Sequence, residues 1–168
     1  LLGPSQLPSF EELNIHEVTE HVASLLQAEI QGKLVVTRDY DPSIPDLLGD
    51  RTQLVQAVLN IARNAMQAIL ESGLEQREIT FKSRIQRSFT IAGEYHKALC
   101  RLDIIDNGPG ISSDIKERIF FPMISGRIEG TGLGLTIAQS AINVHQGIIE
   151  CESEPGHTCF SIYLPIKA

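Results

Sequence analysis

The stretch from residue 51 to residue 71, RTQLVQAVLNIARNAMQAILE, is the longest segment of the sequence with helical periodicity. Successive residues of an α-helix are rotated by about 100°, so side chains three or four residues apart share a face. One face is apolar and consists of Leu54, Val58, Ile61, Ala62, Ala65 and Ile69. Asp50 stands directly before the stretch, where its carboxylate can cap the first turn. The pattern predicts one long helix whose apolar face packs on a core.

The opposite face of this helix carries uncharged amides. They lie within about 40° of one line along the helix, and they are Gln53, Gln56, Asn60, Asn64 and Gln67. A solvated face more often carries Lys and Glu, and Asn is a poor residue for a helix interior. Neutral amide oxygens suit a Mg²⁺ ion that already has phosphate and water ligands. We therefore interpret the row as functional, with a merely solvated polar face as the alternative.

Helix and strand patterns alternate around this segment. Further helices are predicted over residues 13–30, 112–119 and 133–145, and Gly147 is expected to end the last one as a left-handed cap. Strands are predicted over residues 33–40, 78–91, 99–106, 148–153 and 158–165. Three main helices and five or more strands, with antiparallel hairpins, indicate an α+β two-layer sandwich rather than a doubly wound parallel sheet.

The segment from Arg101 to Asp106 predicts a strand that ends in a carboxylate. Side chains alternate between the faces of a strand, so Leu102, Ile104 and Asp106 share what is expected to be the core face. A carboxylate there needs a hydrogen-bond donor, because burying it unpaired costs free energy. The turn Asn107-Gly108-Pro109-Gly110 follows and lets the backbone bend toward a ligand. The exocyclic amine of adenine is a donor of this kind; an ordinary Asp-initiated turn is the alternative.

A glycine-rich segment, Gly130-Thr131-Gly132-Leu133-Gly134-Leu135, leads into the helix predicted from about Leu133. Backbone N–H groups at a helix N-terminus form a natural phosphate site. The segment is neither a Walker motif, because no Gly-Lys-Ser/Thr follows, nor a dinucleotide fingerprint. We expect residues 120–134 to be a movable loop, in which Arg127 either reaches a terminal phosphate or is simply solvated.

Composition limits the classes of function. The net charge is −7 and no basic run stands out, which argues against a general nucleic-acid surface. Three cysteines without paired spacing argue against a disulfide framework or a zinc site. No apolar run is long enough to span a membrane, and we expect a cytoplasmic protein. The chain lacks an initiator Met, so we expect a piece of a longer protein, with residues 1–12 as linker and residues 13–168 as one domain.

In this order, these segments resemble the GHKL ATPase superfamily, and most closely its sensor histidine kinases. The matching segments are residues 50–65 (N box), 106–111 (first glycine box), 119–122 (F box), 130–135 (second glycine box) and 156–158 (terminal glycine box). Residues 38–45, 121–127 and 155–158 further resemble the sensor kinases of nitrogen regulation.

The resemblance implies a Bergerat-type sandwich, with three helices over a mixed sheet and ATP held between the helices and a mobile lid. It implies Asn64 as a Mg²⁺ ligand, Asn60 at the phosphate end and Asp106 at the adenine, in a pocket shaped by Gly108 and Gly110. Further implied nucleotide contacts are Ile111, Phe120, Arg127, Gly130, Thr131, Gly132, Leu133, Gly134, Leu135 and Thr158. The chain departs from the family at Gln67, where many sensor kinases carry a basic residue, and Arg127 is expected to supply that charge.

The resemblance also implies a reaction and its partners. A kinase of this class passes the γ-phosphate of ATP to a histidine on a separate dimerisation domain. None of the five histidines stands in an acceptor motif, so we expect this chain to bind ATP without phosphorylating itself. The implied partners are the dimerisation domain, an NtrC-like response regulator and the PII signal protein. The whole protein is expected to be a homodimer.

Two other classes of protein remain open. ATPases of the gyrase, Hsp90 or MutL kind place a glutamate base where this sequence has Asn60, and an amide cannot take a proton from water. A non-catalytic regulatory module would have no need for Asn64, Asp106 and the lid glycines together.

Overall fold

The computed structural model describes residues 7–30, 32–111 and 131–166, without the side chains of residues 131–134. Its helices are α1 (Ile15–Glu29), α2 (Arg51–Ser72) and α4 (Thr131–Val144). Its strands are β1 (Glu11–Leu13), β2 (Val35–Asp39), β3 (Leu47–Gly49), β4 (Glu78–Ile91), β5 (Glu94–Asp106), β6 (Ile148–Glu154) and β7 (His157–Pro165). None of the helices in this part of the chain combines the length and apolarity needed to cross a membrane.

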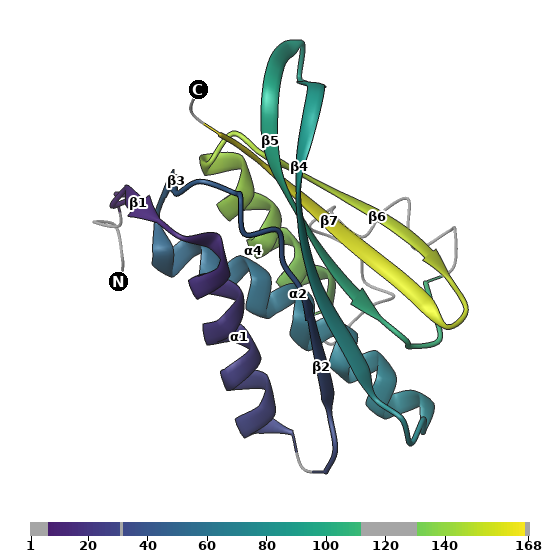
Figure 1. The fold of residues 1–168 in the computed structure, drawn as a ribbon. Helices are drawn as coiled ribbons and strands as arrows, with labels where there is room; N and C mark the ends of the chain where they lie inside the picture. The colour runs from purple at the N-terminus through teal and green to yellow at the C-terminus, as the bar shows by residue number, and fades with distance from the viewer. Residues whose placement is uncertain (1–6, 31, 112–130, 167–168) are drawn as a thin grey trace.

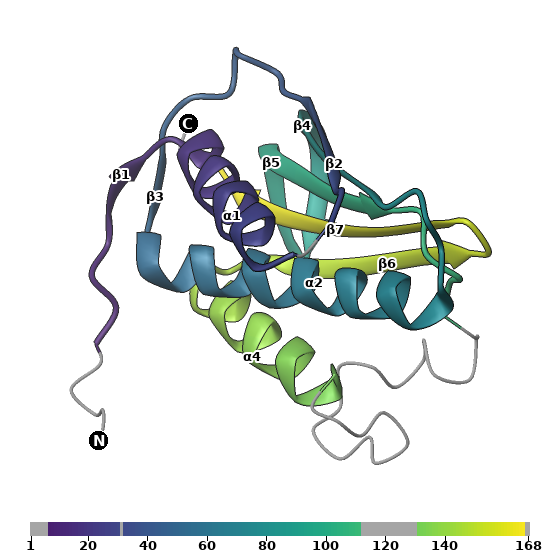
Figure 2. The ribbon, with the colours of Figure 1, turned by 90° about the horizontal axis from the view of Figure 1, so that it is seen from below.

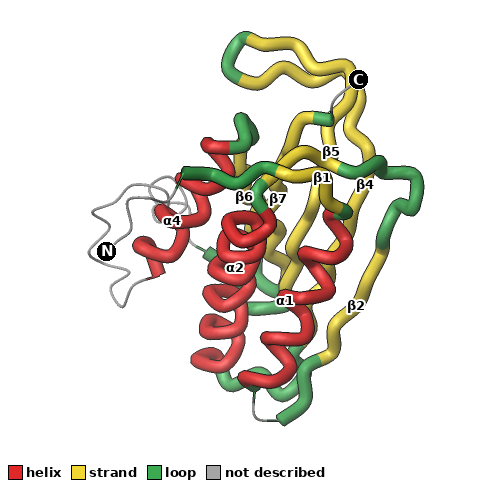
Figure 3. Tube along the Cα trace, turned by 90° about the vertical axis from the view of Figure 1, so that its left-hand side faces the viewer, coloured by secondary structure: helices red, strands yellow, loops and turns green. Residues whose placement is uncertain are grey.

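Five strands form one mixed sheet in the order β2-β4-β5-β7-β6, in which β2 and β4 are parallel and the other neighbours antiparallel. The helices gather on one side of this sheet (Figures 1 and 2). Strands β1 and β3 pair separately as a small antiparallel sheet. The hairpin of β4 and β5 extends beyond the end of the other strands (Figure 3). The predicted α+β two-layer sandwich with a mixed sheet is confirmed.

Helix α2 is the central helix, and its apolar residues lie in the core as predicted. Leu54, Val58, Ile61, Ala62, Ala65 and Ile69 are all buried. The helix begins after Asp50, whose side chain accepts a hydrogen bond from the Gln53 N–H, and it ends at Gly73 in the left-handed conformation. Asp50 also accepts a hydrogen bond from the Ser9 N–H, which ties the N-terminal segment to the helix.

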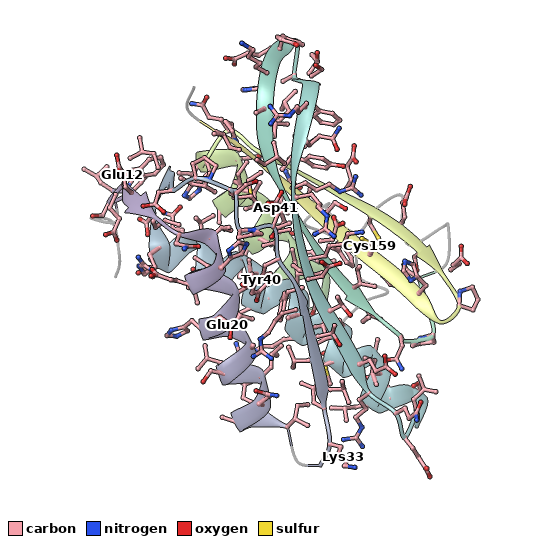
Figure 4. The ribbon with its side chains drawn as sticks, in the orientation of Figure 1. Glu12, Glu20, Lys33, Tyr40, Asp41 and Cys159 are labelled. Atoms are coloured by element: carbon pink, nitrogen blue, oxygen red, sulfur yellow. The ribbon has the colours of Figure 1, made fainter. Side chains whose placement is uncertain are left out.

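Polar side chains fasten helix α1 to the edge strand β2. The hydroxyl of Tyr40, just after β2, donates to the Glu20 carboxylate on α1 at 2.7 Å (Figure 4). Arg38 donates to the same carboxylate at 2.8 Å, and the Thr19 hydroxyl donates to Tyr40 at 2.8 Å. These bonds hold α1 over the parallel pair of strands, at a distance from the ends of β5 and β7.

The structure corrects several predicted boundaries. Helix α1 begins at Ile15 because Asn14 caps it, and the residues before the cap form β1, which pairs with β3; neither short strand was predicted. Strand β5 begins at Glu94 rather than Leu99, since it pairs with β4 up to the turn of the hairpin. Helix α4 begins at Thr131, so the prediction of a loop through residue 134 is wrong at its end. The helix predicted over residues 112–119 and the loop residues 120–130 lie outside the described residues.

The predicted left-handed cap at Gly147 is also wrong. Gln146 has the positive φ, 61°, at the end of α4, and Gly147 does not. A glycine is needed at position 147 because a Cβ atom there would overlap the carbonyl oxygen of Tyr163 on β7. The N–H of Gly147 donates to the Ile142 carbonyl at 3.0 Å, which closes the helix against the sheet.

Two substitutions with opposite expected effects on the free energy of unfolding test the roles of residues 146 and 147. We expect Gln146→Gly to raise the free energy of unfolding by about 1 kcal/mol, because glycine adopts a left-handed backbone without steric cost. Gly147→Ala should lower it by about 1–3 kcal/mol or more, since the backbone of β7 cannot give way cheaply. Chemical denaturation of the two variants measures both effects. A stabilising Gly147→Ala would refute the close approach seen in the structure.

Candidate nucleotide-binding site

A cavity of about 340 Å³ lies between the C-terminal half of α2 and the ends of β5 and β7. Six of the residues predicted for the site line it, and they are Asn64, Asp106, Gly110, Ile111, Leu135 and Thr158. They come from α2, from β5 and the turn after it, from α4 and from β7. The volume lies in the range of small-molecule sites, about 300–1,000 Å³. The fold therefore gathers residues that are up to 94 positions apart, from Asn64 to Thr158, around one opening.

Helix α2 presents only part of its amide row to this cavity. Asn64 lines the cavity, whereas Asn60, one turn earlier, is half-buried and does not. Gln53 and Gln56 line a different groove, between α2 and α4. Gln67 is exposed and donates to Glu71 at 3.2 Å. The row of amides is thus divided, because Asn64 lines the cavity, Gln53 and Gln56 line the groove, and Asn60 and Gln67 line neither.

Asp106 lies on the core face of β5, as the alternation of side chains predicted. Its side chain is buried, with 6% exposed, and it shares this face with buried Leu102 and Ile104. Its Oδ1 atom accepts the N–H of Gly108 at 2.8 Å. Burial raises the pKa of the Asp106 carboxyl group to about 6, an effect that the Gly108 N–H and the nearby His157 only partly oppose. The site therefore contains an acceptor that is costly to ionise without a further donor.

The turn after β5 has little room for side chains. A Cβ atom on Gly108 would lie 2.9 Å from the Asp106 Oδ1 atom and 3.3 Å from Ile69 of α2. Gly110 has φ +94°, and a Cβ there would lie 3.0 Å from the Glu154 carbonyl oxygen. The Gly156 N–H donates to the Gly108 carbonyl at 2.9 Å, which joins this turn to the turn between β6 and β7. Gly108 itself does not line the cavity; it fixes the Asp106 carboxylate that does.

Thr158, one of the implied nucleotide contacts, stands beside Asp106. The two are direct partners in the pairing of β5 with β7, and Thr158 is 3% exposed. Its hydroxyl oxygen lies 2.8 Å from the Oγ atom of Ser153 on β6. Ser153 Oγ also accepts the N–H of Ile111 at 2.8 Å. Sequence reasoning missed Ser153, because one serine in an alternating strand carries no signal of its neighbours across the sheet.

Several predicted site residues fall where nothing can be said of their side chains. Phe120, Arg127 and Gly130 lie outside the described residues. Thr131, Gly132, Leu133 and Gly134 form the first turn of α4 by their backbone. Their roles, and that of Arg127 in particular, remain predictions. Leu135, the first residue of α4 with a described side chain, is buried and lines the cavity.

Two polar features outside the cavity were not foreseen. Asp103 is buried on the sheet face opposite Asp106, where it accepts hydrogen bonds from Arg101 Nε at 3.0 Å and Ser161 Oγ at 2.6 Å. Cys159 lies beside this pair on β7 (Figure 4), and all three cysteines are free thiols. A further buried polar side chain, His145, accepts the Asp50 N–H at 2.9 Å and donates to the Ala141 carbonyl, so both ring nitrogens are used within the fold.

Comparisons with known proteins place relatives of this chain among the histidine kinases. A profile of the family described as histidine kinase-, DNA gyrase B- and HSP90-like ATPases matches residues 49–168. The sensory histidine kinase/phosphatase NtrB of Klebsiella oxytoca is 47% identical over 167 residues, which are 99% of this chain and 47% of that protein. The chain thus spans about half the length of the curated relatives it matches. The narrower resemblance, to the sensor kinases of nitrogen regulation, is confirmed by this similarity to NtrB.

Solved structures of histidine kinases have the same fold. The catalytic domain of the histidine kinase ThkA superposes with a TM-score of 0.76 at 26% identity, over 94% of this chain and 97% of that one. ThkA in complex with the response regulator protein TrrA gives a TM-score of 0.73 at 23% identity, over 95% and 42% of the two chains.

The raised pKa of Asp106 makes the stability of the nucleotide-free protein depend on pH. Because the folded-state pKa is about 6 against an ordinary 3.8, this group favours folding fully below pH 3.8, and the advantage is lost as the pH rises through about 6. We therefore expect Asp106→Asn to raise the free energy of unfolding at pH 7 by about 1–3 kcal/mol and to remove this pH dependence. Urea denaturation of both proteins at pH 5 and pH 7 measures the difference in their free energies of unfolding.

Asp103→Asn serves as the matched control for this substitution. It removes the same charge from the same strand, but there the carboxylate is paired with Arg101, so stability should fall instead. Equal effects of the two substitutions would contradict the different environments of the two carboxylates.

Proposed function

This chain belongs to the family of histidine kinase-, DNA gyrase B- and HSP90-like ATPases, and we propose that it is the catalytic ATP-binding domain of a sensor histidine kinase. In this role it binds Mg-ATP and passes the γ-phosphate to a histidine on a separate dimerisation domain. The observation that carries the proposal is the cavity in which the buried acceptor Asp106 and the amide of Asn64 face one space. One is suited to the base of the nucleotide and the other to its phosphates.

At the base end, Asp106 accepts a hydrogen bond from the exocyclic amine of adenine. Its Oδ1 atom is already bound to the Gly108 N–H, which leaves Oδ2 to accept from the ligand. Ionisation of the buried carboxyl group becomes less costly once the amine donates to it. Ala65 and Phe160, which also line the cavity, provide apolar surface for the purine ring.

At the phosphate end, the amide oxygen of Asn64 fits Mg²⁺. This ion takes oxygen ligands, keeps several waters and is usually bound by one or two protein oxygens together with substrate phosphates. When bound, it neutralises charge that develops on the transferring phosphoryl group. Asn60, one turn away, is proposed for the same end. Arg127 and the glycines of residues 130–134 are proposed as the lid contacts on the family resemblance alone.

An asparagine at position 60 favours transfer over hydrolysis. A hydrolase needs a general base that takes a proton from the attacking water, and an amide cannot do so. A histidine nucleophile needs no such base, because a neutral imidazole nitrogen has its own lone pair. The ATPase alternative therefore lacks its base at this position.

The proposal extends to the rest of the protein and to its partners. The expected boundary at residue 13 moves earlier, because β1 begins at Glu11 and pairs with β3. In this proposal the first residues of the chain link the catalytic domain to the dimerisation domain, in a cytoplasmic homodimer. Histidine kinases act on response regulators, as the ThkA complex with TrrA illustrates for that kinase. The names of the relatives support a nitrogen-regulation kinase, for which an NtrC-like response regulator and the PII signal protein are the proposed partners.

Asp106→Asn should abolish most of the ATP affinity. The asparagine Oδ1 atom would stay with the Gly108 N–H, so its NH₂ group would meet the adenine amine donor against donor. We expect a loss of about 10- to 100-fold in affinity for Mg-ATP, the cost of a hydrogen bond to a charged group. The affinity of the unsubstituted chain should also fall relative to Asp106→Asn as the pH is lowered through about 6.

Calorimetry at several pH values measures both effects. Protonation of the nucleotide changes the affinities of the two proteins by the same factor, so it cancels in the ratio of their affinities. An affinity ratio that does not change with pH would contradict the adenine contact.

Phosphoryl transfer tests the kinase assignment directly. The purified chain, mixed with a separate histidine-containing dimerisation domain, should transfer label from γ-labelled ATP. Asn64→Ala should reduce the rate on the order of 100-fold, because the metal loses its protein ligand. Gln67→Ala is the control, since Gln67 shares the helix face but does not line the cavity. Release of free phosphate without labelled histidine would instead support an ATPase.

A further inference from the structure

The segment before β1 is fastened to the ends of two helices. The Ser9 N–H donates to the Asp50 carboxylate at 2.8 Å, and the Phe10 ring stacks on the His145 ring, with centroids 4.9 Å apart and 13° between the planes. Asp50 is the N-cap of α2, and His145 directly follows α4. We call this set of contacts the N-terminal joint, and its members are Ser9, Phe10, Asp50 and His145.

His145 connects the two helices within the joint. The Asp50 N–H can only donate, so the Nε2 atom of His145, 2.9 Å away, accepts its hydrogen bond. The Ala141 carbonyl oxygen can only accept, so the Nδ1 atom, 2.7 Å away, carries the ring proton. The ring is buried, and a Cβ atom on Gly49 would lie 3.0 Å from it. The start of α2 and the last turn of α4 are therefore joined through one closely packed ring in a defined tautomer.

Asp50 binds the helix and the N-terminal segment at the same time. Its Oδ1 atom accepts the Gln53 N–H at 3.1 Å, which caps α2, and its Oδ2 atom accepts the Ser9 N–H. Asp50 is buried, and a buried carboxylate oxygen that loses a donor costs free energy. The folded domain should therefore keep residues 7–10 attached, although Phe10 itself is 42% exposed.

The two helices of the joint also carry two walls of the cavity. Asn64 lies on α2, 14 residues after Asp50, and Leu135 lies on α4, ten residues before His145. These separations are about 21 Å and 15 Å along the helix axes. The helices lie side by side, with one groove between them (Figure 2). The joint thus holds one end of a helix pair whose other end borders the cavity, while none of its four members lines that cavity.

We propose that the N-terminal joint is a regulatory contact, through which attachment of residues 7–10 and binding of Mg-ATP strengthen each other. The joint restricts the motion of α2 against α4. A nucleotide that contacts both helices then has less motion left to restrict, so binding costs less conformational entropy. In the proposed kinase this segment leads from the dimerisation domain, so the placement of that domain changes the affinity of the site. The inference rests on the proposed binding of ATP in this cavity.

Phe10→Ala tests the coupling, because it removes the ring that holds the segment on His145. We expect the affinity for Mg-ATP to fall about fivefold, the lower end of the usual range of coupling between sites. A chain shortened to begin at Glu11 lacks both contacts of the segment and should lose at least as much. Titration calorimetry supplies the affinities, at a temperature where thermal unfolding shows each protein to be folded.

Phe89→Ala is the matched control. The Phe89 ring also stacks on another ring, that of Tyr163, with centroids 4.7 Å apart, but it belongs to the β4–β5 hairpin and not to the helix pair. Its removal should lower the thermal stability and leave the affinity for Mg-ATP unchanged. If Phe10→Ala behaves in the same way as Phe89→Ala, the joint has a structural role only, and the inference is overturned.

Amide exchange measures the same coupling from the other side. Binding at one site must affect the second site by the same factor in return. Saturating Mg-ATP should therefore slow exchange of the Ser9 N–H about fivefold in the unsubstituted chain, and this effect should be lost in Phe10→Ala. Amides at the tip of the β4–β5 hairpin are the control for a general effect of the ligand. Ser9 exchange that ignores Mg-ATP would contradict the inference.

The remaining outcomes separate the inference from the proposed function. If Phe10→Ala does not fold, Phe10→Leu decides in its place, since leucine keeps apolar bulk without a ring and should give a smaller loss of affinity. If the unsubstituted chain does not bind Mg-ATP, the proposed function fails together with the inference. If it binds Mg-ATP and Asp106→Asn weakens binding, but changes at Phe10 do not, only the inference fails.

Discussion

Burial of the Asp106 carboxyl group on the core face of the sheet is the constraint on which the rest of the site depends. The group is 6% exposed, and among the described residues the donor recorded for it is the Gly108 N–H. A buried carboxylate with one donor is poorly compensated, and this is why its pKa is raised to about 6. The buried carboxylate therefore lowers the stability of the nucleotide-free domain, and the same carboxylate can accept a hydrogen bond from a ligand. Shifted pKa values of this kind are common at functional sites.

The glycines next to Asp106 follow from the same constraint. To donate to the carboxylate, the turn must pass close to both α2 and the turn between β6 and β7. A Cβ atom on Gly108 would meet the carboxylate and Ile69, and one on Gly110 would meet the Glu154 carbonyl oxygen. Absence of a side chain matters here for close approach, and at Gly110 also for a left-handed backbone. The turn is thus held from two sides of the sandwich and presents the carboxylate in a fixed position.

Features that follow from the periodicity of side chains along a helix or strand could be predicted from the sequence. Contacts that depend on how neighbouring strands are aligned could not. The alternation of side chains in β5 correctly predicted that Asp106 lies on the core face, and the spacing of apolar residues correctly predicted helix α2. Asp103 has the parity of an outer face, yet it is buried, because Arg101 and its cross-strand partner Ser161 cover it. Ser153 is recognisable only once β6 is placed beside β7. The end of α4 was misjudged because close packing against β7, rather than φ, requires the glycine there.

The amides of α2 can be understood from charge as well as from metal preference. The chain carries a net charge of −7, and the acidic residues Asp106 and Glu71 both line the cavity. A carboxylate at position 64 would also bind Mg²⁺, but it would add repulsion next to a polyphosphate in a partly enclosed space, where screening by water is weak. An amide oxygen offers a ligand to the ion without that charge. At position 60 the same choice removes the base that hydrolysis requires. In the proposed function, one kind of side chain on one helix face would therefore both help to hold the phosphates and leave no base for their hydrolysis.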